Sequence, residues 1–460
     1  MFTSINPATG DPGATYPELT GDQVEERVAR AAAAYREWRL SDPAERAGLL
    51  RRIADRFEAE AERLAGIATA EMGKTLKSAR AEVAKCVAGF RYYAEAGPAM
   101  LEPVRTPAGD GVAEARWLPI GPVLAVMPWN FPYWQVVRFL APTIMAGNVG
   151  LLKHASLTQG CAAAIEEMVL AAGAPEGVFQ NLAIRASKVA DLITDDRIAA
   201  VTLTGSEEAG AKVAGQAGRA LKKVVLELGG SDPFIVMPSA DLDAAAKAAV
   251  TARIQNAGQS CICAKRMIVH ADVYDAFAER FARGMREVRV GDPTDEGNDM
   301  GPLSSGEQRD TVLEQLEQFK AAGATLSGGE ALPGPGAYMA AGVLMDVPVD
   351  SEVAKEELFG PVAMLFRAAD IDEAIRIAND TPFGLGSSVW TGQEVERERF
   401  ARDLEAGMVA VNQMLASTPE APFGGVKRSG HGRELGPWGL HEFMSLKTLF
   451  LPGAAGQAGD

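Results

Sequence analysis

Short apolar runs that alternate with helix-like segments are the feature that most limits the folds open to this chain. Five such runs follow one another after Pro122, at 123–127, 149–152, 179–182, 200–204 and 224–228. Strands that alternate with helices over this length form a parallel sheet with helices on both of its faces. The sequence therefore predicts an α/β fold, in which ligands collect at the carboxyl ends of the strands.

Four residues that suit ligand binding stand at the ends of these runs. Each lies at or just past the last residue of an expected strand: Asn130, Lys153, Gly205 and Glu227. Because the carboxyl ends of parallel strands meet at one edge of a sheet, one crevice can hold all four residues.

The rest of the chain contains a second alternation and a helical N-terminal part. Strands are expected at 267–269, 362–366, 387–390 and 408–411, between Gly230 and about Phe443. In the first hundred residues, Thr20 and Gln23 form a capping-box pattern, Pro43 marks a second helix start, and a third helical run covers 74–93. A chain of 460 residues is long enough for two or three domains.

Composition limits the class of partner and the compartment. The 45 basic and 61 acidic residues give a formal charge of −16, which argues against a nucleic-acid partner. No run approaches the roughly 18 apolar residues of a membrane span, and the N-terminus shows no secretory signal. Four cysteines indicate a reducing compartment, and the four histidines show no metal-ligand spacing. We therefore expect a cytoplasmic, metal-free protein.

Cys261 lies in the stretch Gln-Asn-Ala-Gly-Gln-Ser-Cys-Ile-Cys-Ala at 255–264, between a helix-like and a strand-like run. Such a loop can expose the thiol at a cleft, and its backbone N–H groups lower the thiol pKa. A small buried core cysteine is the alternative. Asn130, in Met-Pro-Trp-Asn-Phe-Pro, and Glu227, in Leu-Glu-Leu-Gly-Gly, add an amide donor and a carboxylate. The three residues together favour acyl chemistry through a thioester.

These three segments resemble the aldehyde dehydrogenase superfamily. The resemblance extends from 5–10 to 422–430 and includes Glu-Glu-Leu-Phe-Gly-Pro at 356–361. Within the superfamily, the chain is most similar to bacterial succinate-semialdehyde dehydrogenases, on the residues at 152–155 and 229–234 and on the paired Cys261 and Cys263.

The resemblance implies a domain organisation. A Rossmann-type cofactor-binding domain would comprise 1–102 and 118–229, and an α/β catalytic domain 230–443. A small β-segment, 103–117 and 444–460, would bridge the subunits of a homodimer or homotetramer.

The resemblance also assigns catalytic roles. The Cys261 thiolate would attack the aldehyde carbon, and the side chain of Asn130 and the backbone N–H of Cys261 would stabilise the oxyanion, each donor being worth roughly 3–4 kcal/mol. Glu227 would take a proton from the water that hydrolyses the thioester, if burial raises its pKa toward neutrality. Taken alone, Asn130 is also typical of a turn before an X-Pro step, and Glu227 of a solvated strand end.

A nicotinamide dinucleotide would accept the hydride. No G-x-G-x-x-G pattern follows the early strands, and the run 204–210 instead opens a helix after a strand, which suits a phosphate but is also a common helix start. The resemblance implies cofactor contacts from Trp129, Lys153, Ser156, Gly205, Ser206, Leu228, Glu357 and Phe359. Many NAD-preferring relatives carry glutamate where this chain has Ser156. We therefore expect NADP to be preferred and NAD to be used less well.

Two residues are candidates for the substrate site. Arg138, eight positions after Asn130, matches an arginine that meets the distal carboxylate in the succinate-semialdehyde subgroup, although its ordinary reading is a surface ion pair. Ser417 is a second contact. Gln255 departs from the pattern, because some family members carry another arginine there. The expected reaction is the oxidation of succinate semialdehyde to succinate.

Other functions stay open at this point. They are a broader aldehyde dehydrogenase for other short aldehydes, a cofactor-free cysteine hydrolase, and a non-catalytic protein on the same scaffold. No histidine motif accompanies Cys261 as a hydrolase would need. Cys263 is either packing or, as the resemblance implies, a partner in a reversible oxidative switch.

Overall fold

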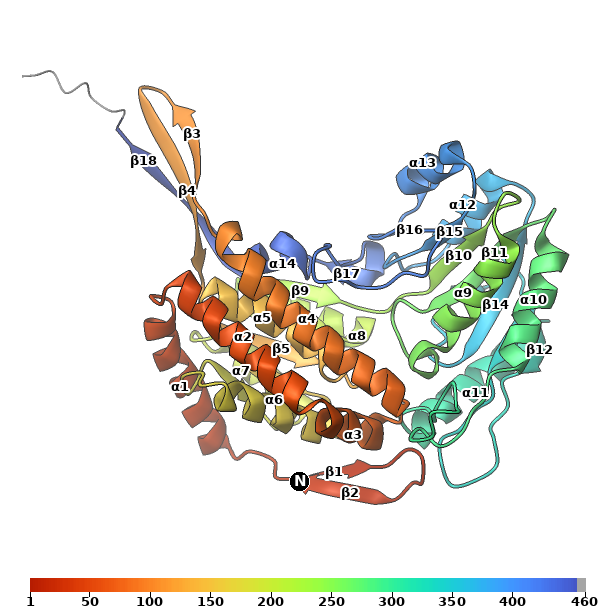
Figure 1. The fold of residues 1–460 in the computed structure, drawn as a ribbon, viewed down its shortest axis with the longest axis horizontal. Helices are drawn as coiled ribbons and strands as arrows, with labels where there is room; N and C mark the ends of the chain where they lie inside the picture. Colours follow the sequence, from red (N-terminus) through yellow and green to blue (C-terminus); the bar gives the residue numbers. More distant parts are fainter. Residues whose placement is uncertain (453–460) are drawn as a thin grey trace, which may run out of the picture.

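The structure is a computed structural model that describes residues 1–452, and two open sheets form its centre (Figure 1). The first sheet has six strands in the order β17-β9-β8-β5-β6-β7, and only the pairing of β17 with β9 is antiparallel. Its strands are β5 (Pro122–Met127), β6 (Val149–His154), β7 (Phe179–Asn181), β8 (Ala200–Thr204), β9 (Lys223–Glu227) and β17 (Gly430–His431). All five strands predicted after Pro122 are present, and the predicted α/β class is confirmed.

Eight helices belong to the first half of the chain. They are α1 (Gly21–Trp38), α2 (Pro43–Ala59), α3 (Ala61–Met72), α4 (Leu76–Met100), α5 (Trp134–Ala146), α6 (Gln159–Ala171), α7 (Val189–Thr194) and α8 (Glu207–Arg219). The capping box of Thr20 and Gln23 and the helix start at Pro43 are confirmed. The helix α4 continues beyond the predicted end at Tyr93. Every residue of α5 is buried, so this helix places Arg138 inside the protein.

The second sheet has seven strands in the order β12-β13-β14-β11-β10-β15-β16, all parallel except β12. Its strands are β10 (Asp232–Val236), β11 (Ala264–His270), β12 (Thr325–Gly328), β13 (Gly342–Met345), β14 (Val362–Ala368), β15 (Ser388–Trp390) and β16 (Ala410–Val411). Its helices are α9 (Leu242–Ile254), α10 (Tyr274–Arg286), α11 (Gly306–Ala321), α12 (Ile371–Asn379) and α13 (Glu394–Asp403).

A three-stranded antiparallel sheet stands away from the body of the molecule at the upper left of Figure 1. It has the order β18-β4-β3 and comprises β3 (Val104–Ala108), β4 (Gly111–Pro119) and β18 (Met444–Leu451), and the helix α14 (Gly436–Glu442) precedes β18. We call this sheet the arm. The residues 453–460 of the predicted oligomerisation segment lie outside the described residues. A separate hairpin joins β1 (Phe2–Ile5) to β2 (Pro12–Tyr16).

The described residues 1–452 contain neither a membrane-spanning helix nor a cluster of metal-binding side chains. No helix in this range combines the length and the apolar character that a membrane crossing requires. The same range holds no cluster of histidine, cysteine, aspartate or glutamate that could bind a metal ion.

Candidate active site

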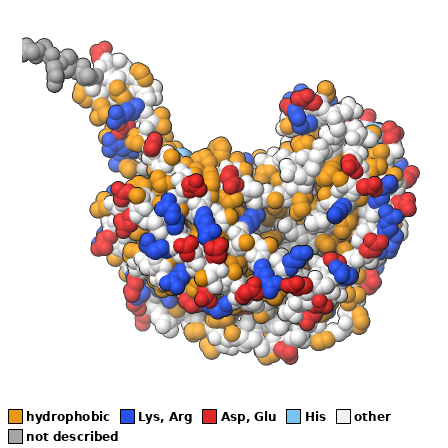
Figure 2. Space-filling model, in the orientation of Figure 1, with side chains coloured by type: hydrophobic (Ala, Val, Ile, Leu, Met, Phe, Trp, Pro, Cys, Tyr) orange, Lys and Arg blue, Asp and Glu red, His pale blue; other side chains and the backbone are white. Residues whose placement is uncertain are grey.

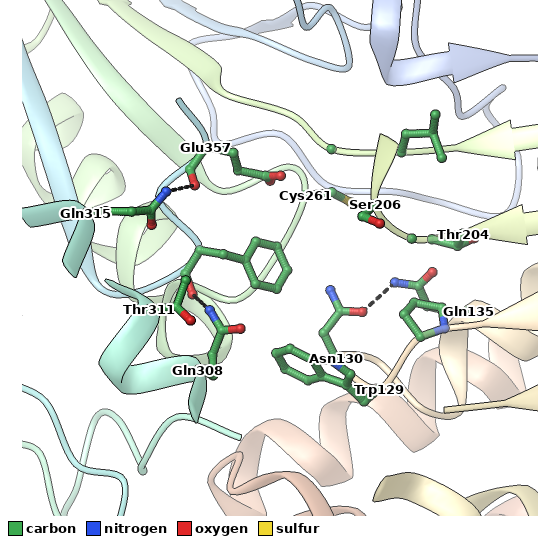
Figure 3. A pocket seen from close by; sticks show the side chains of 15 residues that line it. Trp129, Asn130, Gln135, Thr204, Ser206, Cys261, Gln308, Thr311, Gln315 and Glu357 are labelled. Atoms are coloured by element: carbon green, nitrogen blue, oxygen red, sulfur yellow. Dashed lines mark hydrogen bonds between the residues drawn. The ribbon is translucent and has the colours of Figure 1, made fainter. Parts of the chain in front are cut away.

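A cavity of about 310 Å³ brings most of the predicted site residues together (Figure 3). The cavity lies between the carboxyl ends of β5, β8 and β9 on one side and α11 on the other. Eight predicted residues line it: Trp129, Asn130, Gly205, Ser206, Leu228, Cys261, Glu357 and Phe359. Seven further residues line the cavity that were not predicted from the sequence: Pro128, Gln135, Thr204, Gly229, Gln308, Thr311 and Gln315. The predicted nucleophile and most of the predicted cofactor residues therefore share one cavity.

The loop before Cys261 has an unusual backbone. Three consecutive residues, Asn256, Ala257 and Gly258, have φ values of 54°, 56° and 75°. A Cβ atom on Gly258 would lie 2.2 Å from the carbonyl oxygen of Gly360, so only glycine fits there. The side-chain amide of Asn256 donates to the carbonyl of Asn130 at 2.7 Å. The loop is thus held in a strained conformation against the segments that carry Asn130 and Glu357.

Two buried cations join the same segments. The guanidinium of Arg253 donates to the carbonyl oxygens of Gly258 at 2.9 Å and Leu358 at 3.2 Å. The ammonium of Lys265 donates to the carbonyl oxygen of Cys261 at 2.9 Å and lies 3.1 Å from the carboxylate of Glu357. Because charge-assisted hydrogen bonds are strong in a buried setting, these side chains fix the position of the cysteine loop.

The acidity of Cys261 differs from the expectation. The surrounding protein desolvates the half-buried thiol and raises its pKa to about 12, although the charges of Arg138 and Lys265 lower it. The prediction that the loop lowers the thiol pKa is therefore wrong. Desolvation of the thiolate outweighs the loop dipoles and the two cations.

Asn130 is buried and its side chain is fixed at both ends. Its amide nitrogen donates to the carbonyl of Gln259 at 3.0 Å, and its amide oxygen accepts from Gln135 at 2.9 Å (Figure 3). An amide nitrogen carries two N–H donors, so one remains for a ligand in the cavity. This is the geometry that an oxyanion donor needs.

Glu227 ends β9 but does not line the cavity. Its carboxylate is buried, and among residues 1–452 neither oxygen has a hydrogen-bond partner. Burial raises its pKa well above the ordinary value and the neighbouring Glu434 adds to the rise, while Arg138 and Arg433 oppose it. The expected rise in pKa is confirmed, and Glu434 is the charged neighbour that contributes most to it.

Arg138 is not on the surface. Its Nε lies 2.8 Å from a carboxylate oxygen of Glu434, and its Nη2 donates to the Gln135 side chain at 3.2 Å. Its guanidinium also stacks 4.4 Å from the ring centroid of Phe423. The alternative of a surface ion pair is therefore wrong. The guanidinium is one half of a buried ion pair, whose partner the sequence analysis missed because Glu434 comes from a distant segment.

Ser417 is buried next to α4 and α5. Its hydroxyl oxygen lies 2.8 Å from the ammonium of Lys85 and 3.0 Å from the indole nitrogen of Trp134. Lys85 was not among the predicted residues, since a lysine in an amphipathic helix pattern is ordinarily solvated.

Two of the predicted cofactor residues, Lys153 and Ser156, lie at the end of β6 or just past it, outside the cavity lining. Lys153 is buried, and its burial lowers the ammonium pKa. It forms no ion pair within the described part of the chain. Ser156 is exposed, where a short 3₁₀ helix begins. An uncompensated ammonium beside an exposed hydroxyl suits a phosphate group.

The opposite wall of the cavity comes from the second half of the chain. The rings of Trp129 and Phe359 meet edge to face at 5.8 Å. Gln308 donates to the carbonyl of Phe359 at 2.9 Å, and Gln315 donates to that of Glu357 at 3.3 Å (Figure 3). These bonds hold the segment 356–361 against the cavity.

Cys263 is fully buried, and its thiol lies 3.4 Å from the carbonyl of Gln255. All four cysteines are free thiols in this structure.

The chain is similar to known proteins in sequence and in fold. The sequence model described as the aldehyde dehydrogenase family matches residues 1–449. The chain is 52% identical over 454 residues to succinate-semialdehyde dehydrogenase (NADP+) 1 of Mycobacterium tuberculosis strain H37Rv. This match covers 98% of the chain and 99% of that protein. The chain is also 52% identical to succinate-semialdehyde dehydrogenase (NADP+) of Mycolicibacterium paratuberculosis, over 100% of this chain and 98% of that protein. A solved structure of succinic semialdehyde dehydrogenase from Streptococcus pyogenes in complex with NADP+ superimposes with a TM-score of 0.96 at 36% identity, over 98% of this chain and 100% of that one.

Proposed function

The chain belongs to the aldehyde dehydrogenase family, and from this premise we propose that it oxidises succinate semialdehyde to succinate with NADP as the preferred hydride acceptor. The observation that carries the proposal is the cavity that brings together Cys261, Asn130 and most of the predicted cofactor residues. The named activity of the 52% identical relatives supports the choice of substrate. A cofactor-free hydrolase and a non-catalytic protein are not favoured by this family membership.

Cys261 is the nucleophile in this proposal. Its sulfur, once deprotonated, attacks the aldehyde carbon, and the charges of Arg138 and Lys265 favour the thiolate that this step needs. The second N–H of Asn130 and the backbone N–H of Cys261 donate to the oxyanion that forms. NADP, when bound, supplies the hydride acceptor.

Glu227 is the base for the second half of the reaction. A carboxylate whose pKa is raised by burial can accept a proton from water near neutral pH. The activated water attacks the Cys261 thioester, and succinate leaves as the thiol is restored. Glu227 does not line the cavity, so its side chain must turn toward Cys261 for this step.

Lys153 and Ser156 fit the 2′-phosphate of NADP. The buried ammonium of Lys153 has no acidic partner within residues 1–452, and the exposed hydroxyl of Ser156 adds a donor. Gly205, Ser206 and Leu228 would hold the pyrophosphate side, with Glu357 and Phe359 toward the nicotinamide ribose and ring.

The arm and the two sheets support a division of the chain into three parts. We place the cofactor-binding domain at 1–102 and 118–229, the catalytic domain at 230–443, and an oligomerisation segment at 103–117 and 444–460. The strand β17 falls within 230–443 in sequence but pairs with β9 of the first sheet.

A panel of aldehydes and cofactors tests the proposal. Formation of reduced cofactor is followed by absorbance with succinate semialdehyde and butanal, each with NADP and NAD. We expect the highest kcat/KM for succinate semialdehyde with NADP, and Ser156→Glu should shift the preference toward NAD by adding a charge that repels the phosphate. Equal kcat/KM for the two aldehydes would instead indicate the broader aldehyde dehydrogenase. A wild-type kcat/KM that is higher with NAD would refute the cofactor assignment.

A further inference from the structure

Lys85 is a half-buried cation that lacks an anion. It lies on α4, and its ammonium is 2.8 Å from the Ser417 hydroxyl and 4.8 Å from the ring centroid of Trp134. Among residues 1–452, no carboxylate forms an ion pair with it. Removing an ammonium from water without a paired anion is costly.

Three other buried cations nearby pair with carboxylates, while Arg253 donates to backbone carbonyl oxygens instead. Lys74 pairs with Glu82, Lys265 with Glu357, and Arg138 with Glu434. Lys153, which we assign to the cofactor phosphate, is buried and forms no ion pair in the described part of the chain. The half-buried Lys222 also lacks an ion pair but donates to the backbone carbonyl of Asp195. Lys85, which contacts a hydroxyl group and an aromatic ring, therefore differs from the cations that form structural ion pairs.

Arg138 alone gives a weak site for a substrate carboxylate. Its charge is already balanced by Glu434, so an entering carboxylate would add a second negative charge to a neutral pair. Lys85 supplies the positive charge that is missing, and the two cations are close enough for Arg138 to lower the pKa of Lys85. Their mutual repulsion is relieved when an anion lies between them.

The position of Lys85 also suits the substrate. Its neighbour Trp134 directly precedes Gln135, which lines the active-site cavity and binds both Asn130 and Arg138. Lys85 and Arg138 do not line the cavity themselves, and Gln135, which accepts from Arg138, connects them to it.

We propose that Lys85 is a specificity-determining residue that binds the distal carboxylate of the substrate together with Arg138. Ser417 acts by holding the ammonium of Lys85 and the indole of Trp134, which makes it a positioning residue for this site. The inference rests on the proposed function and deepens it, because it names the group that selects an aldehyde with a carboxylate at its far end.

The test compares two lysines of one helix. Lys85→Met removes the proposed carboxylate partner, while Lys77→Met removes an exposed lysine of α4. The ratio of kcat/KM for succinate semialdehyde to that for butanal is measured for each variant, with melting temperatures to verify folding. We expect Lys85→Met to lower the ratio at least about tenfold, the effect of losing a charged hydrogen bond, and Lys77→Met to leave it unchanged. An unchanged ratio in a folded Lys85→Met enzyme would overturn the inference and leave the proposed function standing.

Binding of succinate gives a second readout that needs no particular substrate. As the proposed product, succinate should inhibit oxidation of whichever aldehyde the enzyme uses, and its inhibition constant should rise at least about tenfold in Lys85→Met. Absence of inhibition in the wild type would overturn the carboxylate site. Lys85→Arg, which keeps the charge, should recover part of the loss. If wild-type enzyme shows no preference for succinate semialdehyde, the proposed function fails; equal inhibition constants in wild type and Lys85→Met overturn the role of Lys85.

The pH dependence of this inhibition separates charge from packing. Burial, together with Arg138, lowers the pKa of Lys85 to about 8, while Cys86 and Glu82 of its own helix raise it. The ammonium is therefore lost as the pH rises through about 8. In the wild type, the inhibition constant of succinate should rise above that pH, and in Lys85→Arg the rise should be absent because a guanidinium stays charged. The same pH profile in both proteins would mean that Lys85 acts only by packing on Trp134.

Discussion

Burial sets the reactivity of Cys261 before any ligand binds. A thiol with a pKa of about 12 is almost wholly protonated at neutral pH, and its thiolate fraction rises tenfold per pH unit below that value. We therefore expect the rate of alkylation of Cys261 by iodoacetamide to rise steadily from pH 7 to pH 10 without a plateau. Peptide mass spectrometry identifies the modified cysteine. A plateau near pH 8 would contradict the raised pKa.

The same measurement reports the charge of Arg138. Because this guanidinium lowers the Cys261 pKa, Arg138→Met should slow alkylation at any fixed pH in this range. The exposed Arg36 of α1 provides the matched control, and Arg36→Met should alkylate at the wild-type rate. Equal rates in all three proteins would place Arg138 beyond electrostatic reach of the thiol.

Substitution of the two catalytic residues should give different kinetics. Cys261→Ala removes the nucleophile and should abolish turnover while cofactor binding is retained. Glu227→Gln should release a burst of reduced cofactor equal to the active sites and then stall, since the thioester forms but its hydrolysis lacks a base. Stopped-flow absorbance measures both phases. Steady turnover of the glutamine variant at the wild-type rate would assign the base to another group.

The prediction of reversible oxidative control of the enzyme concerns Cys263. Its thiol is buried and lies two residues from Cys261 in sequence, where it could resolve an oxidised Cys261. Peroxide should inactivate the wild type reversibly, with dithiothreitol restoring activity, and Cys263→Ala should make much of the loss irreversible. If both proteins recover to the same extent, Cys263 serves only in packing.

At the scale of the elements, local signals were sufficient where the residues that define an element are neighbours in sequence. The helix start at Thr20 and the five strands after Pro122 carry caps, turns and apolar runs of their own. The strand β10 was missed although it is central in its sheet, because it begins with Asp232-Pro233 and its parallel partners come from distant segments. Propensity does not report such non-local pairing.

In the candidate site, too, residues within local motifs were predicted, and contacts between distant segments were not. The sequence predicted Cys261, Asn130 and most of the cavity lining, because each stands at an element end within a family motif. The ion pair of Arg138 with Glu434 and the contacts of Arg253 join segments that are far apart, and no local pattern marks them. The raised pKa of Cys261 was missed for the same reason, since it depends on burial by the assembled fold.

The conformation of the loop before Cys261 is expected to be required for both stability and activity. Gly258→Ala combines a positive φ with a Cβ atom 2.2 Å from the carbonyl oxygen of Gly360, so the loop must shift. We expect a loss of about 2 kcal/mol or more in the free energy of unfolding and a large drop in kcat, measured by urea titration and steady-state assay. Gly306→Ala, at the start of α11 in open space, is the control and should be neutral. A stable, fully active Gly258→Ala protein would show that the loop geometry is not required.

At the scale of the whole molecule, the two sheets face a shared cavity and the arm leaves the body. Cys261 and Glu357 come from the second half of the chain, and Asn130 and Gly205 from the first, so the site exists only when both sheets are assembled. Figure 2 shows the surface hollowed between the arm and the part that carries α13. The arm forms no part of the cavity lining and needs a different explanation.

An isolated three-stranded sheet with exposed apolar side chains and two unpaired edges is unstable in water and prone to associate. Phe450 of β18 is 80% exposed, and Val104 of β3 and Leu446 of β18 are also exposed. We propose that another copy of the chain covers these side chains, as the predicted homodimer or homotetramer requires.

Phe450→Glu tests the proposed role of the arm. A charge in the middle of an apolar contact between subunits should shift the protein to a smaller assembly at micromolar concentration, because a buried unpaired carboxylate is costly. Size-exclusion chromatography with light scattering measures the mass. Val395→Glu on α13 removes a side chain of the same 80% exposure on another surface and should keep the wild-type mass. If Phe450→Glu retains the wild-type mass, or if the wild type is itself a monomer, the arm does not join subunits through this face.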